Sequence, residues 1–378
     1  MNEEGELRVA VDARCLNTDH VRGMGKYLRE LVSRADALER VNWRFFGDRP
    51  DQPFHLPDVR RSLATRFDCK GYRFHSWEQI GLPWCVRRAA RGGVLHAAQT
   101  SLPWWQPVPT IVTLHDTIPW KWAHPEPFER WYWNRLLPAA LARCAVVITI
   151  SEASRRDILG LWPNLESKLR VVRHGIEDMY LGLAPGPRPT AVSGLIGNRR
   201  YLLFVGGTSP HKRFDWALQV FERLAAPDLQ LLALGFTAPE VGPVRSRLPA
   251  SIADRIKFLP YVADREMPYV YQHALATLYP TRYEGFGFPA LESQAVGTPI
   301  LFSPVGSLAE LAGPLAEVVP ADDLQAWTAT LDQIVASRVG ELPAASQAKA
   351  WAQQFSWTRS AQQHLDIYRS ARDHASDQ

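Results

Sequence analysis

Short apolar segments alternate with amphipathic segments along this chain, and the alternation runs twice through its 378 residues. Apolar runs rich in Val, Ile and Leu, each followed by a helical pattern, are typical of parallel strands joined by crossover helices. Residues 183–199 separate the two runs and are rich in Pro, Gly and small side chains, which is typical of a linker. We therefore predict an α/β fold with two doubly wound domains.

Both predicted domains are Rossmann-like. We place an N-terminal domain at residues 1–182 and a C-terminal domain at residues 200–356. The predicted strands, each an apolar run, lie within residues 7–13, 42–46, 93–97, 109–114, 145–150, 171–178, 201–207, 229–236, 255–264, 266–281 and 299–313.

Composition excludes several classes of protein. A hydrophobic content of 46% and a charged content of 22% are those of a soluble globular protein, and a net charge of +4 is too small to indicate nucleic-acid binding. The acidic N-terminus is unlike a secretion signal, and no apolar run approaches the length of a membrane-spanning helix. Four widely spaced cysteines lack metal-binding spacing and indicate reduced thiols, so we expect a cytoplasmic protein: Cys15, Cys69, Cys85 and Cys144.

The stretch 281–299 is the strongest candidate for a ligand site. Glu284 and Glu292 stand eight positions apart around the loop Gly285–Phe286–Gly287, and Pro289 fits the first turn of a following helix. A helix N-terminus behind a glycine loop favours an anion such as a phosphate, and the two acids would reach hydroxyls on either side. The alternative is a plain turn in which Glu292 only complements the helix dipole.

Three other positions lie where strands give way to turns. Gly23 and Gly25 are predicted in the link between the first strand and the first helix, and Leu28 excludes a dinucleotide-binding G-x-G-x-x-G. Gly207 ends a later strand. His115 follows the strand 109–114, where it could meet a ligand or pair with its neighbour Asp116.

Two adjacent cations complete the list of candidates. Lys212 and Arg213 stand where the turn after Gly207 becomes a helix, so cations and backbone amides could converge on one diphosphate. An exposed, solvated pair is the alternative.

The segment TRYEGFGFPALESQAVGTP resembles the Glu-x7-Glu signature of the retaining GT-B glycosyltransferases of family 4. IVTLHD (111–116) and VGGTSPHKRFD (205–215) are similar to two further segments of that family. The resemblance spans nearly the whole chain. One departure is Gly207, which stands where many members carry an arginine.

The resemblance implies a site in the cleft between the two domains. Glu292 would bind the ribose hydroxyls, Glu284 the hydroxyls of the donor sugar, and Lys212 with Arg213 the diphosphate. His115 would contact the sugar from the opposite domain. Gly23 and Gly25 would lie near the acceptor and the diphosphate, and a C-terminal helix at about 357–378 would cross back onto the first domain. The chain contains no Asp-x-Asp, so no metal is expected.

The resemblance also implies retention of configuration and domain closure over a nucleotide-sugar donor. GDP-mannose is the first choice of donor and a UDP-hexose the alternative, with a saccharide or lipid-linked saccharide as acceptor in cell-surface polysaccharide synthesis. A nucleotide-sugar epimerase and a non-catalytic sugar-nucleotide-binding protein stay open, whereas nothing marks the pyridoxal-phosphate lysine of a phosphorylase.

Residues 60–91 combine many basic residues with aromatic ones. Such a surface could lie on anionic lipid headgroups and bring the protein to the inner face of the cytoplasmic membrane. A solvated helix face is the alternative. The aromatic residues of this segment are Tyr72, Phe74, Trp77 and Trp84.

Overall fold

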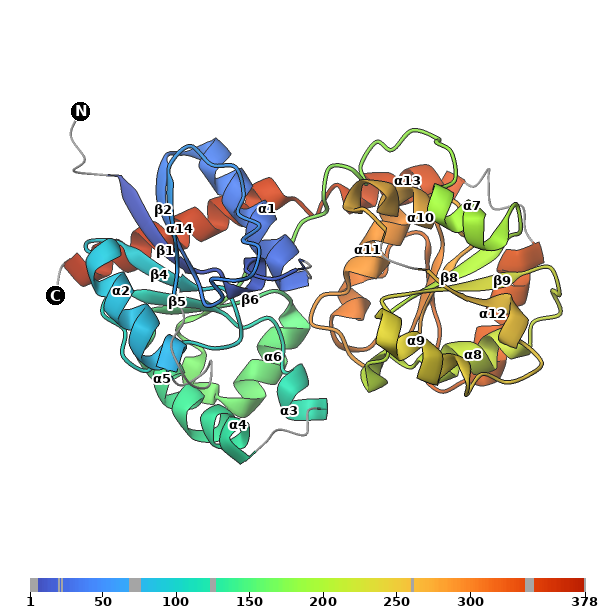
Figure 1. Ribbon diagram of the computed structural model, residues 1–378, viewed down its shortest axis with the longest axis horizontal. Coiled ribbons are helices and arrows are strands. Elements are labelled where there is room, and N and C mark those ends of the chain that lie inside the picture. The colour runs from blue at the N-terminus through green and yellow to red at the C-terminus, as the bar shows by residue number, and fades with distance from the viewer. Residues whose placement is uncertain are drawn as a thin grey trace. The chain divides into compact units, whose positions relative to one another are not determined.

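The computed structural model describes residues 6–19, 21, 23–67, 76–122, 127–259, 262–336 and 343–376. The chain divides into two compact units, residues 1–175 with 356–378 (unit 1) and residues 176–355 (unit 2) (Figure 1). Each unit is a parallel sheet with helices on its faces, so the predicted α/β fold is confirmed. Residues 183–199, predicted as a linker, belong to unit 2 and form helix α7 (Thr190–Ile196). Their Pro- and Gly-rich composition concealed this short helix, which buries Val192 and Ile196.

Unit 1 contains a seven-stranded parallel sheet in the order β3-β2-β1-β4-β5-β6-β7. The strands predicted before residue 151 are present, whereas the last one, predicted within residues 171–178, lies at Leu169–Val171 instead. Strand β3 was not predicted, because its side chains are basic or exposed rather than apolar. The bounds are β1 Leu7–Asp12, β2 Val41–Gly47, β3 Ser62–Arg66, β4 Val94–Ala97, β5 Thr110–Thr113, β6 Val146–Thr149 and β7 Leu169–Val171.

Helices cover this sheet, and two of them from opposite ends of the chain, α1 and α14, pack together. Tyr27 of α1 hydrogen-bonds Thr113 at 2.9 Å and His364 of α14 at 2.9 Å, while Tyr368 hydrogen-bonds His96 at 2.7 Å. These buried polar bonds fix the C-terminal helix on unit 1. The α-helices are α1 Gly23–Leu38, α2 Leu82–Ala89, α3 Ile118–Trp122, α4 Pro127–Trp131, α5 Leu137–Arg143, α6 Glu152–Leu161 and α14 Trp357–Ser376, with π-helical turns at Trp77–Gly81 and Tyr132–Leu136.

Unit 2 contains a six-stranded parallel sheet in the order β10-β9-β8-β11-β12-β13. Its core gathers buried leucines and valines with a group of phenylalanines, including Phe204 and Phe214, whose ring centres are 4.9 Å apart. The strands are β8 Tyr201–Val205, β9 Gln230–Leu234, β10 Ile256–Phe258, β11 Thr277–Tyr279, β12 Ile300–Phe302 and β13 Ala316–Val318. Besides α7, the α-helices are α8 Phe214–Glu222, α9 Ala238–Arg245, α10 Met267–Gln272, α11 Phe288–Ala295, α12 Leu324–Ala336 and α13 Pro343–Ala352.

The strand order locates one crevice in each sheet. The order reverses between β1 and β4 in unit 1 and between β8 and β11 in unit 2. In open parallel sheets, ligands bind beyond the carboxyl ends of the strands at such a reversal. The residues that follow β8 and β11 are therefore the first place to look for a ligand site in unit 2.

Candidate active site

A three-residue polar cluster lies at the strand reversal of unit 2. Lys212 ends a 3₁₀ turn (Pro210–Lys212) beyond β8, Tyr279 is the last residue of β11, and Glu284 stands on the loop that follows. The Lys212 ammonium donates to Glu284 Oε1 at 2.7 Å and to the Tyr279 hydroxyl at 3.2 Å. Tyr279 is fully buried and also hydrogen-bonds Glu284. Lys212 lies in the turn after β8, as its position in the sequence predicts, and its contact with Glu284 joins two of the predicted site residues. The sequence gave no sign of Tyr279.

The electrostatics of this cluster favour a cation held in a fixed position. The Lys212 and Glu284 side chains are 20% and 9% exposed, so their ion pair is only weakly screened by solvent. Burial, and after it the Glu284 carboxylate, raise the pKa of Tyr279 well above its usual value, so the hydroxyl stays protonated. Such an arrangement presents one ammonium to an incoming anion while a carboxylate and a hydroxyl orient it.

Glu292 lies on α11, and two tyrosines hold it. Tyr271 of α10 donates to Glu292 Oε2 at 2.7 Å, and Tyr180 also hydrogen-bonds this carboxylate. Burial and the nearby Glu292 raise the pKa of both tyrosines well above the usual value, so both remain donors. A carboxylate offers about four acceptor positions. Glu292 therefore has the capacity to accept hydroxyl groups of a ligand as well.

The glycine loop between the two acids is tightly packed. Gly287 caps α11 with φ +101°, and a Cβ there would lie 2.5 Å from Leu308. Phe286 is buried with its ring 5.1 Å from that of Phe288, and its carbonyl accepts from the Ser307 hydroxyl at 2.5 Å. Gly285, the first glycine of the loop, is also buried. The predicted first-turn position of Pro289 and the end of the helix at Ala295 are confirmed.

Arg213 does not join Lys212, although the two residues are adjacent. Its backbone adopts φ +55°, which turns its side chain toward Asp322 at 2.5 Å and places its guanidinium 4.4 Å above the Trp216 ring centre. The predicted convergence of both cations on one point is therefore not what the structure shows. Lys212 is the cation that reaches Glu284.

Gly207 explains the departure from the family pattern. It adopts φ +67°, and a Cβ there would lie 2.4 Å from the carbonyl oxygen of Gly235. This turn therefore requires glycine, because a side chain would be strained and would collide with backbone. Glycine therefore stands here in place of the arginine that many members of the resembled family carry.

His115 lies in unit 1, directly beyond β5 and beside the strand reversal of that sheet. Its Nε2–H donates to the Ala98 carbonyl oxygen at 3.2 Å, and its ring meets Tyr27 edge-on at 5.0 Å. Burial lowers its pKa to about 4, so the imidazole is neutral at physiological pH. Asp116 accepts from the backbone N–H of Ile118 at 2.8 Å, at the start of α3. The meeting of His115 with the unit 2 residues stays a prediction.

Gly23 and Gly25 lie elsewhere than predicted. Both belong to the first turn of α1 rather than to the preceding link, because the helical pattern extends four residues upstream of Tyr27. Gly23 is exposed and open to solvent. A Cβ on Gly25 would lie 2.7 Å from the Cys15 carbonyl oxygen, so close backbone packing accounts for that glycine.

Sequence reasoning missed a buried charged network at the strand reversal of unit 1. Arg14 donates to Asp12 at 2.6 Å and to Glu78 at 2.7 Å, and Tyr132 donates to Glu78 at 2.7 Å. Arg14 also donates to Ser101 at 2.9 Å. The sequence carries no signal for the network, because Glu78, Ser101 and Tyr132 come from segments far from Asp12 and Arg14.

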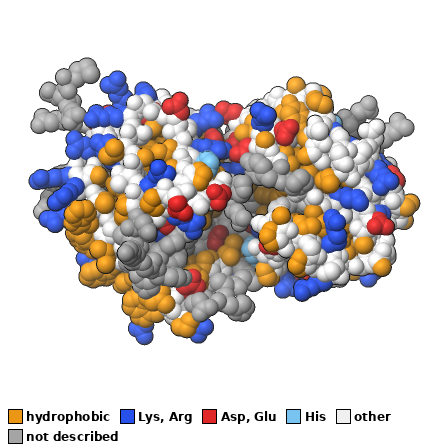
Figure 2. All heavy atoms as spheres, viewed as in Figure 1, with side chains coloured by type: hydrophobic (Ala, Val, Ile, Leu, Met, Phe, Trp, Pro, Cys, Tyr) orange, Lys and Arg blue, Asp and Glu red, His pale blue; other side chains and the backbone are white. Residues whose placement is uncertain are grey.

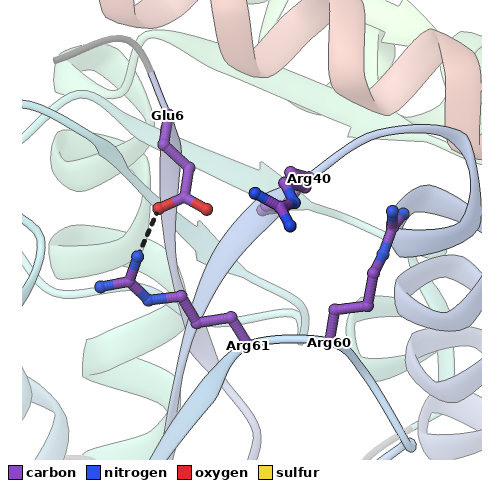
Figure 3. A pocket seen from close by; sticks show the side chains of 5 residues that line it. Glu6, Arg40, Arg60 and Arg61 are labelled. Atoms are coloured by element: carbon purple, nitrogen blue, oxygen red, sulfur yellow. Dashed lines mark hydrogen bonds and ion pairs between the residues drawn. The ribbon is translucent and has the colours of Figure 1, made fainter. Parts of the chain in front are cut away.

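Unit 1 also has a hollow on the side of its sheet opposite to the carboxyl ends of the strands (Figure 3). Glu6, Val41 and Arg61 precede or begin β1, β2 and β3, so the hollow sits at the amino ends of the strands. Arg61 pairs with Glu6 at 2.9 Å, and Arg40 and Arg60 complete the lining. This position is away from the carboxyl-end crevice where His115 lies.

The sequence of this chain matches two glycosyltransferase family models. The model for glycosyl transferases group 1 matches residues 190–353, and the model for glycosyltransferase family 4 matches residues 21–179. Together the two matches cover most of each unit. The chain is a family 4 glycosyltransferase.

Named relatives agree with this family. The O-antigen chain mannosyltransferase B of Escherichia coli is 26% identical over 374 residues, covering 96% of this chain and 92% of the relative. The D-inositol 3-phosphate glycosyltransferase of Mycolicibacterium smegmatis is 29% identical over 236 residues, covering 60% of this chain and 52% of the relative. This chain thus spans about half the length of the second relative.

Solved structures show that this glycosyltransferase has the GT-B fold. Sucrose-phosphate synthase from Thermosynechococcus elongatus matches with a TM-score of 0.74 at 18% identity, covering 97% of this chain and 99% of that one. Anabaena Alr3699/HepE in complex with UDP and glucose matches with a TM-score of 0.71 at 17% identity, covering 97% and 100%.

The described residues show neither a cluster of metal-binding side chains nor a membrane-spanning helix. Within those ranges, no group of three or more His, Cys, Asp or Glu side chains is placed to hold a metal ion. None of the helices the structure describes is both long and apolar enough to cross a bilayer. Independence from metal stays a prediction.

Proposed function

We propose that this glycosyltransferase moves a hexose, with retention of configuration, from a nucleoside diphosphate sugar to a saccharide acceptor. The single observation that carries the proposal is the Lys212–Glu284–Tyr279 cluster, which lies at the strand reversal of unit 2 with Glu292 on the following helix. A cation beside two fixed carboxylates matches the needs of a ligand with a diphosphate between two groups of hydroxyls.

Each side chain has a role in this proposal. Lys212 binds the diphosphate and stabilises the negative charge that develops as the bond between the sugar and the phosphate oxygen breaks. Glu292 accepts the ribose hydroxyls and Glu284 those of the sugar. The acceptor oxygen bonds to the same face of the sugar, and its proton passes to the departing phosphate oxygen. His115, neutral because of its lowered pKa, positions the sugar.

Because Arg213 pairs with Asp322 instead, Lys212 and the backbone amides near the start of α11 hold the diphosphate in this proposal. No metal is required in this scheme. Gly23 and Gly25 lie at the start of α1 in unit 1, where free helix amides would face an acceptor or phosphate. Phe286 and the loop glycines shape the wall of the donor pocket.

GDP-mannose is the proposed donor, and a UDP-hexose is the alternative. Support for mannose comes from the O-antigen chain mannosyltransferases of Escherichia coli and Salmonella typhimurium, which are 26% and 24% identical to this chain. Support for UDP comes from the Anabaena protein, whose structure holds UDP and glucose. The same O-antigen relatives support a saccharide acceptor. Our proposal is that this saccharide is lipid-linked and is used at the cytoplasmic face of a membrane, with peripheral contact through unit 1.

Thermal unfolding with nucleotides tests the donor site. The full chain is heated with GDP, UDP, dTDP or ADP, and then with the sugar conjugate of whichever nucleotide raises its unfolding temperature. A ligand at a hundred times its dissociation constant adds about 2.7 kcal/mol of stability. The variant Glu292→Ala should lose this shift, whereas Glu222→Ala, at the far end of α8, should keep it. A shift retained by Glu292→Ala would overturn the donor-site assignment.

Product analysis then tests the reaction. The identified nucleotide sugar is incubated with a mannose-containing saccharide, and the linkage formed is determined by NMR. An α-linked product from an α-linked donor supports retention. A new nucleotide sugar formed without acceptor would instead show an epimerase.

A further inference from the structure

One helical face of unit 1 exposes large apolar side chains. The π-helical turn Trp77–Gly81 continues into α2, and Ile80 and Trp84 stand four residues apart on it. Side chains at this spacing share one face of a helix. Ile80 is 68% exposed and Trp84 is 56% exposed, whereas Trp77 points inward and is 1% exposed. This helix therefore has a buried face and an apolar face that the described residues of unit 1 leave exposed.

A loop from a different part of the chain extends this face. Trp104 and Trp105 follow β4 and are 45% and 39% exposed. Their loop is fastened to the helix, since the Trp104 N–H donates to Gln79 Oε1 at 2.8 Å. Gln79 immediately precedes Ile80, so Trp104 lies beside the helical turn that carries Ile80.

Arginines surround these aromatic side chains. The Arg88 guanidinium lies 4.8 Å from the Trp84 ring centre, and that of Arg143 lies 4.5 Å from the Trp104 ring centre. A hollow of about 900 Å³ opens next to Trp84. Its lining includes Arg87, Arg88, Arg91 and Arg372 together with the loop 107–109.

Arg372 of this hollow pairs with Asp373 at 2.8 Å, but the other three arginines lack such a partner among the described residues. Within the described ranges, Arg87, Arg88 and Arg91 have no ion pair with a carboxylate. Figure 2 shows hydrophobic side chains gathered at the left edge of unit 1, over the region of α2 in the view of Figure 1, with Lys and Arg side chains beside them. One guanidinium group can donate two parallel hydrogen bonds to a phosphate, and a guanidinium without a carboxylate partner attracts an anion.

We propose that this surface docks the protein on a bilayer that carries anionic phospholipids. The surface consists of Ile80, Trp84, Trp104 and Trp105 with the arginine-lined hollow beside them, and we call it the Trp/Arg surface. Tryptophan favours the boundary between headgroups and acyl chains, because its ring is apolar and its N–H is polar. Arginines at the same level bind the lipid phosphates.

The Trp/Arg surface differs from the membrane contact predicted over residues 60–91. Trp84 belongs to it, but Trp77 is a core residue, and β3 contributes no aromatic side chain. Tyr72 and Phe74 lie outside the described residues. Trp104, Trp105 and Arg143 come from beyond the predicted segment, so the contact is built from two parts of the chain.

This inference deepens the proposed function and rests on it for its purpose, since an enzyme that uses a lipid-linked acceptor must reach the bilayer. Binding to vesicles requires neither donor nor acceptor. Its outcome is therefore separate from that of the nucleotide experiment.

Vesicle co-sedimentation of the full chain tests the proposal. Vesicles of phosphatidylcholine alone are compared with vesicles that also contain phosphatidylglycerol. We expect binding to the anionic vesicles, weakened by added salt, because exposed charges are screened. Arg87→Gln/Arg88→Gln/Arg91→Gln should reduce the affinity at least tenfold, because each basic residue near the surface contributes roughly fivefold. The matched control is Arg245→Gln/Arg247→Gln in unit 2.

The apolar part has its own variant. Trp84→Ala with Ile80→Ala should reduce binding at every salt concentration, whereas Leu195→Ala, an exposed leucine of unit 2, should not. An unchanged unfolding temperature without ligand shows that each variant is folded. Equal binding by all variants, or no binding of the parent chain to anionic vesicles, would overturn the proposal. A change from dimer to monomer in Trp84→Ala/Ile80→Ala, without vesicle binding by the parent, would instead assign the surface to a second copy of the chain.

Discussion

Glu284→Gln should tighten the binding of the free nucleoside diphosphate while it lowers sugar transfer. Lys212 already has a partner in the unliganded protein, since its ammonium lies 2.7 Å from Glu284 Oε1. A diphosphate that binds Lys212 brings its own negative charge close to that carboxylate. Glutamine keeps the size and a hydrogen-bonding oxygen but removes the charge, so the repulsion disappears.

The magnitude follows from the geometry. A phosphate oxygen about 2.8 Å from Lys212, on the side away from Glu284, lies roughly 5.5 Å from the carboxylate oxygen. Two unit charges at that separation repel by about 3 kcal/mol at an effective dielectric constant of about 20. Residual exposure of both side chains, 20% and 9%, reduces this through screening. We expect about 1–2 kcal/mol, which is a roughly five- to thirtyfold lower dissociation constant.

Isothermal titration calorimetry at fixed ionic strength measures the effect. The ligand is the nucleoside diphosphate identified by thermal unfolding. Glu222→Gln removes the same charge at the other end of α8 and should leave the affinity unchanged. Lys212→Met should weaken binding at least tenfold. The sugar nucleotide should gain less than the free diphosphate, because Glu284→Gln also loses an acceptor for the sugar hydroxyls. An unchanged or weaker affinity in Glu284→Gln, with an unaffected Glu222→Gln, would refute the competition for Lys212.

Three further results are expected. Gly207→Ala should lower the free energy of unfolding by about 1–3 kcal/mol, since φ is +67° there and the added Cβ meets backbone at 2.4 Å, while Gly242→Ala, where the space is open, should be near neutral; equal denaturation curves would contradict this. Tyr279→Phe should keep the fold but lower kcat/KM about tenfold through the lost hydroxyl, and unchanged kinetics would exclude a positioning role. Burial lowers the pKa of His115 and of His364 to about 4, below the unfolded value near 6.5. The free energy of unfolding should therefore be highest above about pH 6.5 and fall as the pH drops toward about 4, by on the order of 3 kcal/mol for each histidine. A calorimetric pH series that stays flat over this range, or one that His364→Gln leaves as steep as before, would contradict this.

The sequence predicted most of what depends on local pattern. The apolar runs gave the strands that lead to Lys212 and Glu284, and Pro289 with the flanking glycines gave the start and end of α11. Pattern was insufficient where a strand is polar, as in β3, and where a short helix such as α7 is rich in small residues.

Side-chain partners could not be predicted in the same way. Lys212 and Arg213 are neighbours with the same charge, yet a single left-handed backbone angle at Arg213 directs them to different acids. Trp77 and Trp84 lie seven residues apart, a spacing that would place both on one face of a regular α-helix, yet one is buried and the other exposed because the segment begins with a π-helical turn. Such differences arise from tertiary packing and from backbone angles that residue type alone does not set.

The place of α14 has a consequence for synthesis on the ribosome. Unit 2 occupies residues 176–355 and is thus inserted within unit 1, whose last helix follows it. Tyr27 and His96 are synthesised before His364 and Tyr368, so they lack these partners until α14 has been made. Domains generally fold as units while the chain emerges. Unit 1 is therefore begun before unit 2 and completed after it, and a nascent chain stalled before residue 356 would carry all of unit 2 but a sheet of unit 1 without α14 over its tyrosine and histidine side chains.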